Sequence, residues 1–321
     1  MSILRIVTGP ADVGVGGYIW DTITGGVFDN KRVEGAFKIG IGAALSVTND
    51  APSGTETWYH FRYAQNENTD INLDSRCVII KDVNSNDIAY IDVVDAKLRM
   101  TAVGDTSSAT GTQSIAEFTA YSIDLHVIVS STVTVRWYIN GALYGEQTVA
   151  NVGTTTRGVA RSITFQWTDS ADQMYMSELI IADEDTRGMR VRELRPKSFG
   201  IFQEWDGSIS ALRDTDLATG ISTAVADRRV SFGITNIENV QPGDVINRVV
   251  AQTFAQKGET GLSAFNHFFR HKNGNVSDGS DQTLSVLGGF FLEEFTTNPD
   301  TAAAWQPEDF SSLQSGVRSR P

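Results

Sequence analysis

The chain has 321 residues, 40% of them hydrophobic and 20% charged, which suits two globular domains and excludes an intrinsically disordered chain. Its formal net charge of −13 argues against a sequence-independent grip on nucleic-acid backbones, which needs clustered Lys and Arg. No stretch approaches the roughly 18 apolar residues that cross a bilayer as a helix, so we expect no membrane insertion.

Cysteine usage and the first residues bear on where the chain folds. Cys77 is the only cysteine, so neither an intrachain disulfide nor a CxxC zinc site is available, and its apolar surroundings predict a buried thiol. The start MSILRIVTGP lacks the basic and apolar parts of a signal peptide. We therefore expect the protein to fold in a reducing cytoplasm.

Alternation of residue character with a period of two dominates the first half of the chain. In 55–63 it places Trp58 and His60 on one face and Tyr59, Phe61 and Tyr63 on the other. The pattern predicts strands over 32–45, 55–63, 77–80, 88–93, 97–103 and 123–129.

The clearest hairpin covers 132–149. Asn140 and Gly141 supply the two positive-φ residues of a type I′ turn between its arms. Strands over 162–167 and 174–181 follow. Many short strands with polar turns and no long capped helices predict an antiparallel sandwich or jelly roll.

The second half repeats this character. Its predicted strands cover 201–205, 229–234, 246–254, 264–271 and 283–291, and Pro307 opens a short predicted helix over 307–314. The fold class is therefore all-β: two jelly-roll-like β-sandwich domains in tandem, with a short C-terminal helix. We place the domains at 1–185 and 201–321, with a connector at 186–200.

Three segments of the first domain resemble a concanavalin-type or laminin-G-like jelly roll. They are WDTITGG at 20–26, the hairpin at 132–147 and the closing strand SELIIAD at 177–183. The resemblance implies a lectin-like sandwich over residues 1–185.

A second resemblance joins ELIIADEDTRGMR at 178–190 to the C-terminal segment 297–319. Together they resemble a family of tailed-bacteriophage and prophage virion structural proteins. The motif residues are Ala182 to Gly188, Asn298, Pro299, Trp305 and Gly316. The resemblance implies a virion component, made in the host cytoplasm, that has other virion proteins as partners.

A lectin-like sandwich raises the question of glycoside hydrolysis, which needs two carboxylates about 5 to 9.5 Å apart on one sheet face. Asp92 and Asp95 have an odd spacing that puts them on opposite faces, and Glu178 stands alone in its strand. We therefore predict no catalytic residue.

Candidate metal and nucleotide sites are weak. His267 and His271 would lie roughly 13 Å apart on one strand face, too far to share a metal. The turn with Asp82, Asn84, Asn86 and Asp87 has calcium-loop spacing, but Val93 stands where an EF-hand needs an acid, so a plain turn is predicted and calcium is kept as an alternative cofactor. The glycines near 14–17 and 40–42 lack the strand-to-helix context of a dinucleotide loop and indicate turns or bulges.

Two groups of residues are candidates for binding. Tyr59, Tyr63 and Tyr138 are candidates for exposed rings that stack on a sugar. Opposite charges in the connector are candidates for interdomain or assembly contacts, as is a C-terminal aromatic residue: Asp183, Glu184, Asp185, Arg187, Arg190 and Trp305.

The leading hypothesis is a structural protein of a phage virion, either a tail fibre, a tail-tip component or a spike, that contacts the host surface, with a surface glycan as one candidate partner. The same fold as a capsid decoration protein or head fibre is the alternative, and a polysaccharide-degrading enzyme is the third. We also expect a homo-oligomer, with a trimer favoured, because exposed sheet edges call for cover by a neighbour.

Overall fold

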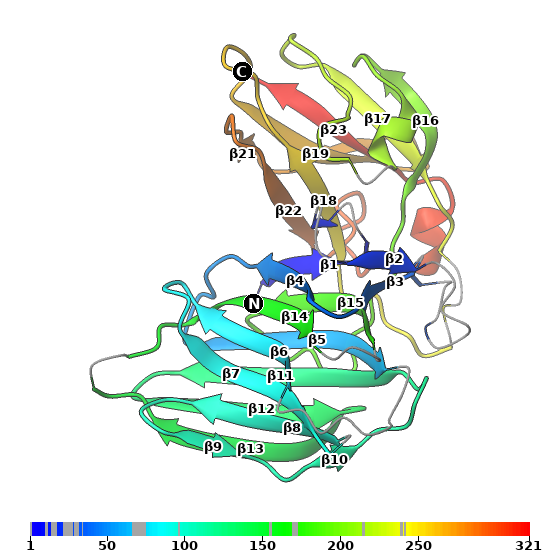
Figure 1. The fold of residues 1–321 in the computed structure, drawn as a ribbon. Helices are drawn as coiled ribbons and strands as arrows, with labels where there is room; N and C mark the ends of the chain where they lie inside the picture. Colours follow the sequence, from blue (N-terminus) through cyan, green and yellow to red (C-terminus); the bar gives the residue numbers. More distant parts are fainter. Residues whose placement is uncertain are drawn as a thin grey trace. The chain divides into compact units, whose positions relative to one another are not determined.

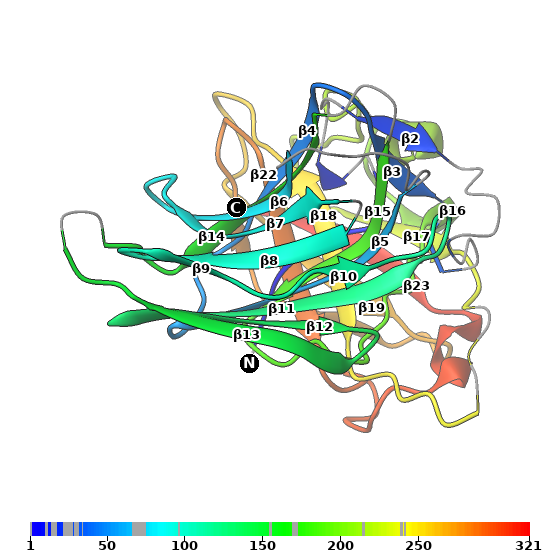
Figure 2. The same ribbon diagram turned by 60° about the horizontal axis from the view of Figure 1, so that its bottom comes forward.

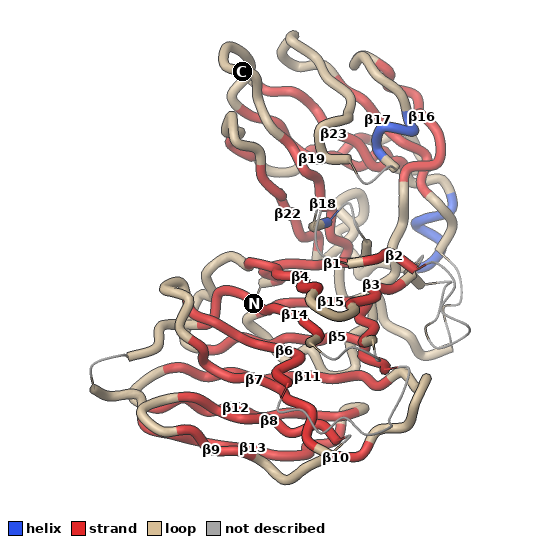
Figure 3. The backbone as a smooth tube through the Cα atoms, in the orientation of Figure 1, coloured by secondary structure: helices blue, strands red, loops and turns tan. Residues whose placement is uncertain are grey.

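The computed structural model describes residues 2–9, 12–13, 18–21, 28, 32–33, 35–65, 75–95, 97–153, 156–168, 173–213, 216–237, 240 and 242–321. These residues form mostly strands and loops, with helix confined to a few short turns (Figure 3), which confirms the all-β prediction. The chain divides into two compact units, Met1–Val191 and Arg192–Pro321, and the division falls inside the predicted connector.

The first unit is a sandwich of two antiparallel sheets (Figure 1). Within the described residues, the eight-stranded sheet has the order β13-β12-β11-β5-β15-β3-β2, and β1 also pairs with β15. Its strands are β1 (Ile3–Val7), β2 (Ile19–Asp21), β3 (Ala36–Ile39), β5 (Glu56–Gln65), β11 (Tyr121–Val129), β12 (Thr132–Ile139), β13 (Ala142–Ala150) and β15 (Met174–Ala182).

The second sheet of this unit has the order β10-β8-β7-β6-β14-β4, with β9 paired to β8. Figure 2 shows β6, β7 and β8 in one layer and β11, β12 and β13 in the other. Its strands are β4 (Ala43–Thr48), β6 (Ser75–Asp82), β7 (Asp87–Val94), β8 (Lys97–Val103), β9 (Ser107–Ala109), β10 (Gln113–Ser114) and β14 (Ala160–Trp167).

The core of the first unit lies between the two sheets because each strand turns one set of alternating side chains inward. On β12, Val133, Val135 and Trp137 are fully buried. The turn that follows has φ of 51° at Asn140 and 81° at Gly141, both positive as a type I′ turn requires, so the predicted hairpin is confirmed. The prediction of a buried Cys77 is confirmed too, and burial raises the pKa of its thiol to about 12.

One predicted strand of this unit is wrong. The stretch 32–45 is not one strand but two, β3 and β4, which belong to different sheets. The chain passes between the sheets through a turn at Gly42, whose φ of 69° favours glycine. The glycines at 40 and 42 indicated a turn or bulge, but apolar residues continue on both sides, so the sequence did not reveal that the chain crosses to the other sheet here.

The second unit also consists of two sheets, one of order β16-β17-β23-β19-β20, with β21 on β19, and a pair β18-β22. Phe265 and Val317 of the larger sheet share a core with Ala255 and Phe291 of the pair. The elements are β16 (Pro196–Gln203), η2 (Ile209–Leu212), β17 (Arg229–Ile234), β18 (Val249–Ala255), β19 (Ala264–Arg270), β20 (Val276–Asp278), β21 (Gln282–Thr283), β22 (Gly289–Phe295), η3 (Pro307–Ser311) and β23 (Gln314–Arg320).

Three details of this unit differ from the sequence prediction. β16 begins at Pro196, inside the predicted connector 186–200 and ahead of the predicted strand 201–205. The predicted strand 283–291 is divided between β21 and β22, which belong to different sheets. The predicted helix over 307–314 is the single 3₁₀ turn η3, capped by Gln306 and Asp309. It ends early because β23 starts at Gln314.

Candidate functional site

The three tyrosines predicted as exposed sugar-stacking rings are buried, so that prediction is wrong. Tyr59 and Tyr63 have no exposed surface, and Tyr138 is 7% exposed. Tyr59 and Tyr63 lie on the face of β5 that points into the core between the sheets. Tyr138 lies on the opposite, outer face of its sheet, where the connector covers it.

The connector is held on this outer face by a buried polar cluster. Thr186 Oγ1 donates a hydrogen bond to Asp124 Oδ1 at 2.9 Å, and His60 Nδ1 lies 2.8 Å from the same oxygen. All three residues have no exposed surface. Because leaving a buried carboxylate without hydrogen bonds costs free energy, Thr186 and His60 together fix the connector to β5 and β11.

A stack of flat side chains continues this attachment. The Arg187 guanidinium lies 4.6 Å from the centre of the Tyr138 ring, and the Trp58 ring is stacked between Tyr138 and His126. Asp185 accepts hydrogen bonds from the Arg187 side chain, which lowers the pKa of that carboxyl. Burial of His126 lowers the pKa of its imidazole, so this ring favours its neutral form. The motif residues Asp185 to Arg187 therefore belong to the packed structure of the first unit.

The remaining connector candidates also have contacts in the first unit. Asp183 accepts hydrogen bonds from Ser53 and from the backbone of Ser2, and these outweigh burial and lower the pKa of its carboxyl. Arg190 Nη1 donates to Ser122 Oγ at 3.4 Å, and Glu184 is half-buried. A role for these charges between units or subunits stays a prediction.

Trp305 does not fit the predicted assembly role. It is 2% exposed and packs in the core of the second unit with Phe269 and Phe310. Its indole N–H donates to the Phe295 carbonyl at 2.8 Å. The motif residue Gly316 is also internal, because a Cβ there would lie 2.4 Å from the Phe268 ring. Both residues therefore shape the core of this unit.

The His60 cluster does not have the arrangement of a catalytic triad. In a triad the hydroxyl contacts the histidine, and the acid contacts the opposite ring nitrogen. Here the hydroxyl of Thr186 contacts the acid, Asp124, and the whole cluster is enclosed. The hydrogen bond from Thr186 to Asp124 attaches the connector to the sheet.

The acids considered for glycoside hydrolysis have structural partners. Asp92 is 3% exposed and binds the Arg99 guanidinium at 2.5 Å. Glu178, 1% exposed, pairs with Arg32 at 3.0 Å and has a φ of 53° at a bulge of β15. A buried, non-glycine residue in the left-handed region is strained, and the ion pair helps to hold it there.

Asp82 organises one end of the sandwich. Its carboxylate accepts hydrogen bonds from the backbones of Asn84, Asn86 and Gly158 and from the Asn86 amide, at 2.8 to 3.0 Å. Burial alone would raise the pKa of Asp82, but these hydrogen bonds outweigh it and lower the pKa. The oxygens of Asp82 are thus engaged by N–H donors, which supports the plain-turn interpretation over a calcium loop.

Asn151 and Asp105 tie further loops into the same end. The Asn151 amide donates to the Ser130 carbonyl at 2.8 Å, and Asp105 accepts a hydrogen bond from the Val152 backbone at 3.1 Å. Val83 and Val152 project from these loops with 67% and 55% of their surface exposed. We call this surface the loop end, defined by residues 82–87, 104–106, 130–131, 151–153 and 156–159.

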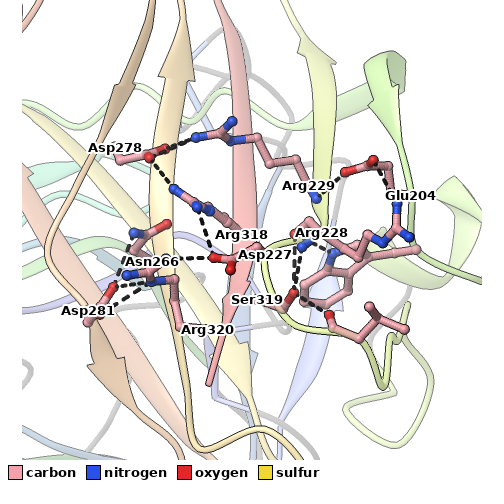
Figure 4. A network of polar contacts seen from close by, with 12 residues as sticks. Glu204, Asp227, Arg228, Arg229, Asn266, Asp278, Asp281, Arg318, Ser319 and Arg320 are labelled. Carbon is pink, nitrogen blue, oxygen red and sulfur yellow. Dashed lines mark hydrogen bonds and ion pairs between the residues drawn. The ribbon is translucent and has the colours of Figure 1, made fainter.

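The second unit carries a network of charges on one face of its larger sheet (Figure 4). Asp227 Oδ1 lies within 2.8 Å of both Arg318 and Arg320, and Asp278 is within 2.8 Å of Arg229 and Arg318. Each of these arginines has a carboxylate partner. The network therefore works as cross-strand links between β17, β20 and β23.

His267 on β19 and His271 directly after it have different hydrogen-bond partners. His267 Nε2 lies 3.0 Å from Thr253 Oγ1, and His271 Nε2 lies 3.1 Å from Ser277 Oγ. Among the residues that the structure describes, no group of three His, Cys, Asp or Glu side chains has the geometry of a metal site. The described part of the chain has no helix long and apolar enough to span a membrane.

Sequence patterns do not reveal how the connector and the loop end are held in place. Thr186, Asn151 and Asp105 are single polar residues in irregular segments, where no periodicity marks them. For Asn151 a weak signal exists, since asparagine after a strand often bonds to nearby backbone. Thr186 belongs to the motif 182–188, but the sequence does not reveal its partner, because Asp124 lies 62 residues away in the chain.

No family model matches the chain, and no curated protein matches it. Similar solved structures include the receptor binding domain of botulinum neurotoxin C/D mosaic serotype, 11% identical, with 57% of this chain and 48% of that chain covered and a TM-score of 0.40. A cellulose induced protein, Cip1, is 14% identical over 57% of this chain and 92% of its own, with a TM-score of 0.39.

A third similar structure is an endo-beta-1,4-glucuronan lyase from the fungus Trichoderma reesei, 11% identical over 57% of this chain and 92% of its own, with a TM-score of 0.38. This chain spans about half the length of the neurotoxin domain, 48%. These similarities concern the β-sandwich fold alone.

Proposed function

We propose that the protein is a structural and binding component of a tailed-bacteriophage virion. A tail fibre, tail-tip or spike component is the preferred form, and the first unit contacts the host surface. The alternative keeps the same fold on the capsid, as a decoration protein or head fibre.

The observation that carries the binding role is the loop end. Four loops are fixed by buried or bridging polar side chains, Asp82, Asp105 and Asn151, and present the exposed residues Val83 and Val152. A rigid scaffold that displays loops at one end is a common way to build a binding surface. Preformed loops lose little conformational entropy when a ligand binds.

The virion assignment rests on the motif residues, and their positions are compatible with it. The segment from Ala182 to Gly188 is fixed on the first unit through Thr186 and Arg187, so the site where the chain leaves this unit is defined. In a virion component that bears mechanical load, a fixed position for the chain as it leaves the first unit is an advantage. The net charge of −13 also keeps neighbouring copies soluble before assembly.

The binding role is tested with variants of the loop end. Val83→Asp combined with Val152→Asp places two charges on the proposed contact surface, and we expect at least a tenfold loss of binding of the purified protein to host cells. Ile41→Asp is the matched control, because Ile41 is 61% exposed and lies beside Trp167, at the end of β14 that is opposite to the loop end.

The melting temperature should stay unchanged in all of these variants, since the replaced side chains are exposed. Equal binding by the loop-end variant and the native protein would exclude the loop end as the contact surface. If the native protein neither binds host cells nor blocks adsorption of the phage, the host-recognition role is wrong.

A further inference from the structure

A hydroxyl, an imidazole and a carboxylate meet between the two sheets of the second unit. Thr253 on β18 places Oγ1 3.0 Å from Nε2 of His267 on β19. On the other side of the ring, Nδ1 of His267 lies 3.3 Å from Oε2 of Glu293 on β22. Within the described residues, neither of these last two atoms has a hydrogen-bond partner.

The surroundings hold each member of this group in place. The Ser280 backbone N–H donates to Glu293 Oε1, so the carboxylate is oriented with its other oxygen toward His267. Gly279 allows this close approach, because a Cβ there would lie 2.1 Å from the Glu293 carboxylate. The edge of the Phe265 ring packs against the imidazole at 5.1 Å. His267 is 2% exposed, whereas Thr253 is partly exposed.

The order of the groups is that of a nucleophile, a base and an orienting acid. It is the reverse of the His60 cluster, where the hydroxyl contacts the acid. With the proton on Nδ1 facing Glu293, Nε2 of His267 has a lone pair for the Thr253 hydroxyl. Nδ1 and Oε2 are 3.3 Å apart and form no hydrogen bond in this structure, and catalytic contacts of this kind commonly tighten when substrate binds.

We propose that Thr253, His267 and Glu293 form a nucleophilic site that hydrolyses small carboxylic esters. Thr253 Oγ1 attacks the ester carbonyl carbon while His267 Nε2 takes the hydroxyl proton. The tetrahedral intermediate collapses, the alcohol leaves with the proton from His267, and an acyl ester remains on Thr253.

Water then attacks this acyl ester, again with His267 as base, and releases the acid and the free hydroxyl. The sum of both steps is ester and water giving acid and alcohol. A small acyl group such as acetyl fits best, because Thr253 is only partly exposed and its methyl group crowds the attacking oxygen.

The test uses the full chain, p-nitrophenyl acetate as substrate and a fluorophosphonate as covalent probe. We expect acetate release and one label per chain, located on Thr253 by peptide mass spectrometry. Thr253→Val removes the hydroxyl at nearly constant volume and should abolish both signals, while Thr253→Ser should keep them. His267→Gln should lower the rate by roughly 100- to 10 000-fold, the range for a general base.

Ser277→Ala is the matched control. Ser277 also places its hydroxyl 3.1 Å from a histidine Nε2, that of His271, but no carboxylate lies within ion-pair distance of His271 among the described residues. This variant should keep full activity and full labelling. Labelling elsewhere in the chain, or hydrolysis by the native protein no faster than by folded Thr253→Val, would overturn the proposal.

The esterase site rests on other residues than the proposed host-binding role, and the two can be contradicted independently. Loss of esterase activity in Thr253→Val with unchanged binding to host cells would leave the binding role intact. Loss of host binding in the loop-end variant should leave ester hydrolysis unchanged, because Val83 and Val152 belong to the first unit.

Discussion

At the scale of single residues, His60, Asp124 and Thr186 form an enclosed polar cluster in the first unit. All three side chains lack exposed surface, and Asp124 Oδ1 receives both contacts. A carboxylate in such a place needs every hydrogen bond it has, because water cannot replace a lost partner. The hydroxyl of Thr186 is therefore the buried contact among those that attach the connector.

Thr186→Val tests the contribution of this hydroxyl. The change keeps the shape of the side chain and removes the donor to Asp124, so the free energy of unfolding should fall by about 1–3 kcal/mol. Urea denaturation followed by tryptophan fluorescence measures it. Thr134→Val is the control, because Thr134 bonds only to Thr148 on the exposed sheet face and its loss should change stability by less than about 0.5 kcal/mol.

The same fall in both variants would mean that the enclosed hydroxyl has no special role. Increased cleavage of the chain near Arg187 by trypsin in Thr186→Val is a second expected sign, since a released connector exposes its arginines. If the free energy of unfolding of Thr186→Val falls but trypsin does not cleave the connector, the destabilisation arises elsewhere in the unit.

Some residues could be assigned from the sequence and others could not. Cys77 was predicted to be buried because an apolar strand surrounds it, and it is. Tyr59 and Tyr63 were assigned to one face of their strand, but alternation does not say which face is the core. Tyr138 and Trp58 face outward and are still buried, since the connector covers them. Such cover comes from tertiary structure, which local pattern does not contain.

At the scale of elements, the sequence predicted a strand boundary correctly where the turn has characteristic residues. The hairpin β12–β13 was predicted because Asn140 and Gly141 both suit positive φ, and both have it. The stretch 32–45 was predicted as one strand because nothing in its alternation marks the turn between β3 and β4. Periodicity describes strands well, but the sheet to which a strand belongs depends on pairing with distant segments.

Gly141→Ala tests the importance of the hairpin turn. Gly141 has a φ of 81° and open space around its Cα, so an added methyl group meets no atom and acts only through the backbone. Left-handed conformations cost L-residues about 1–2 kcal/mol, and we expect a loss of that size in the free energy of unfolding. Gly111→Ala is the control, since Gly111 also has open space but no positive φ.

Equal stability of Gly141→Ala and the native protein would show that the turn adopts another conformation in solution. A similar loss in Gly111→Ala would show that glycine flexibility, and not the sign of φ, is responsible. The measurement is again urea denaturation, at one pH and one salt concentration for all three proteins.

At the scale of the whole molecule, two all-β units follow each other in one chain and divide between Val191 and Arg192. The first unit offers a loop end connected by hydrogen bonds, and the second offers a charge network and the proposed site at Thr253. A homo-oligomer, with a trimer favoured, remains our proposal for the assembled form. Among the described residues no strand pairs with the outer edge of β13, and this edge, with Leu143 57% exposed, supports contacts between copies.

Electron microscopy of intact particles, with an antibody raised against the purified protein, tests the virion assignment most directly. We predict label at the tail tip and, after averaging, density with threefold symmetry at that position. Label on the head shell would support the capsid alternative in place of the tail. Particles that carry no label, with all of the protein free in solution, would contradict the assignment to the virion.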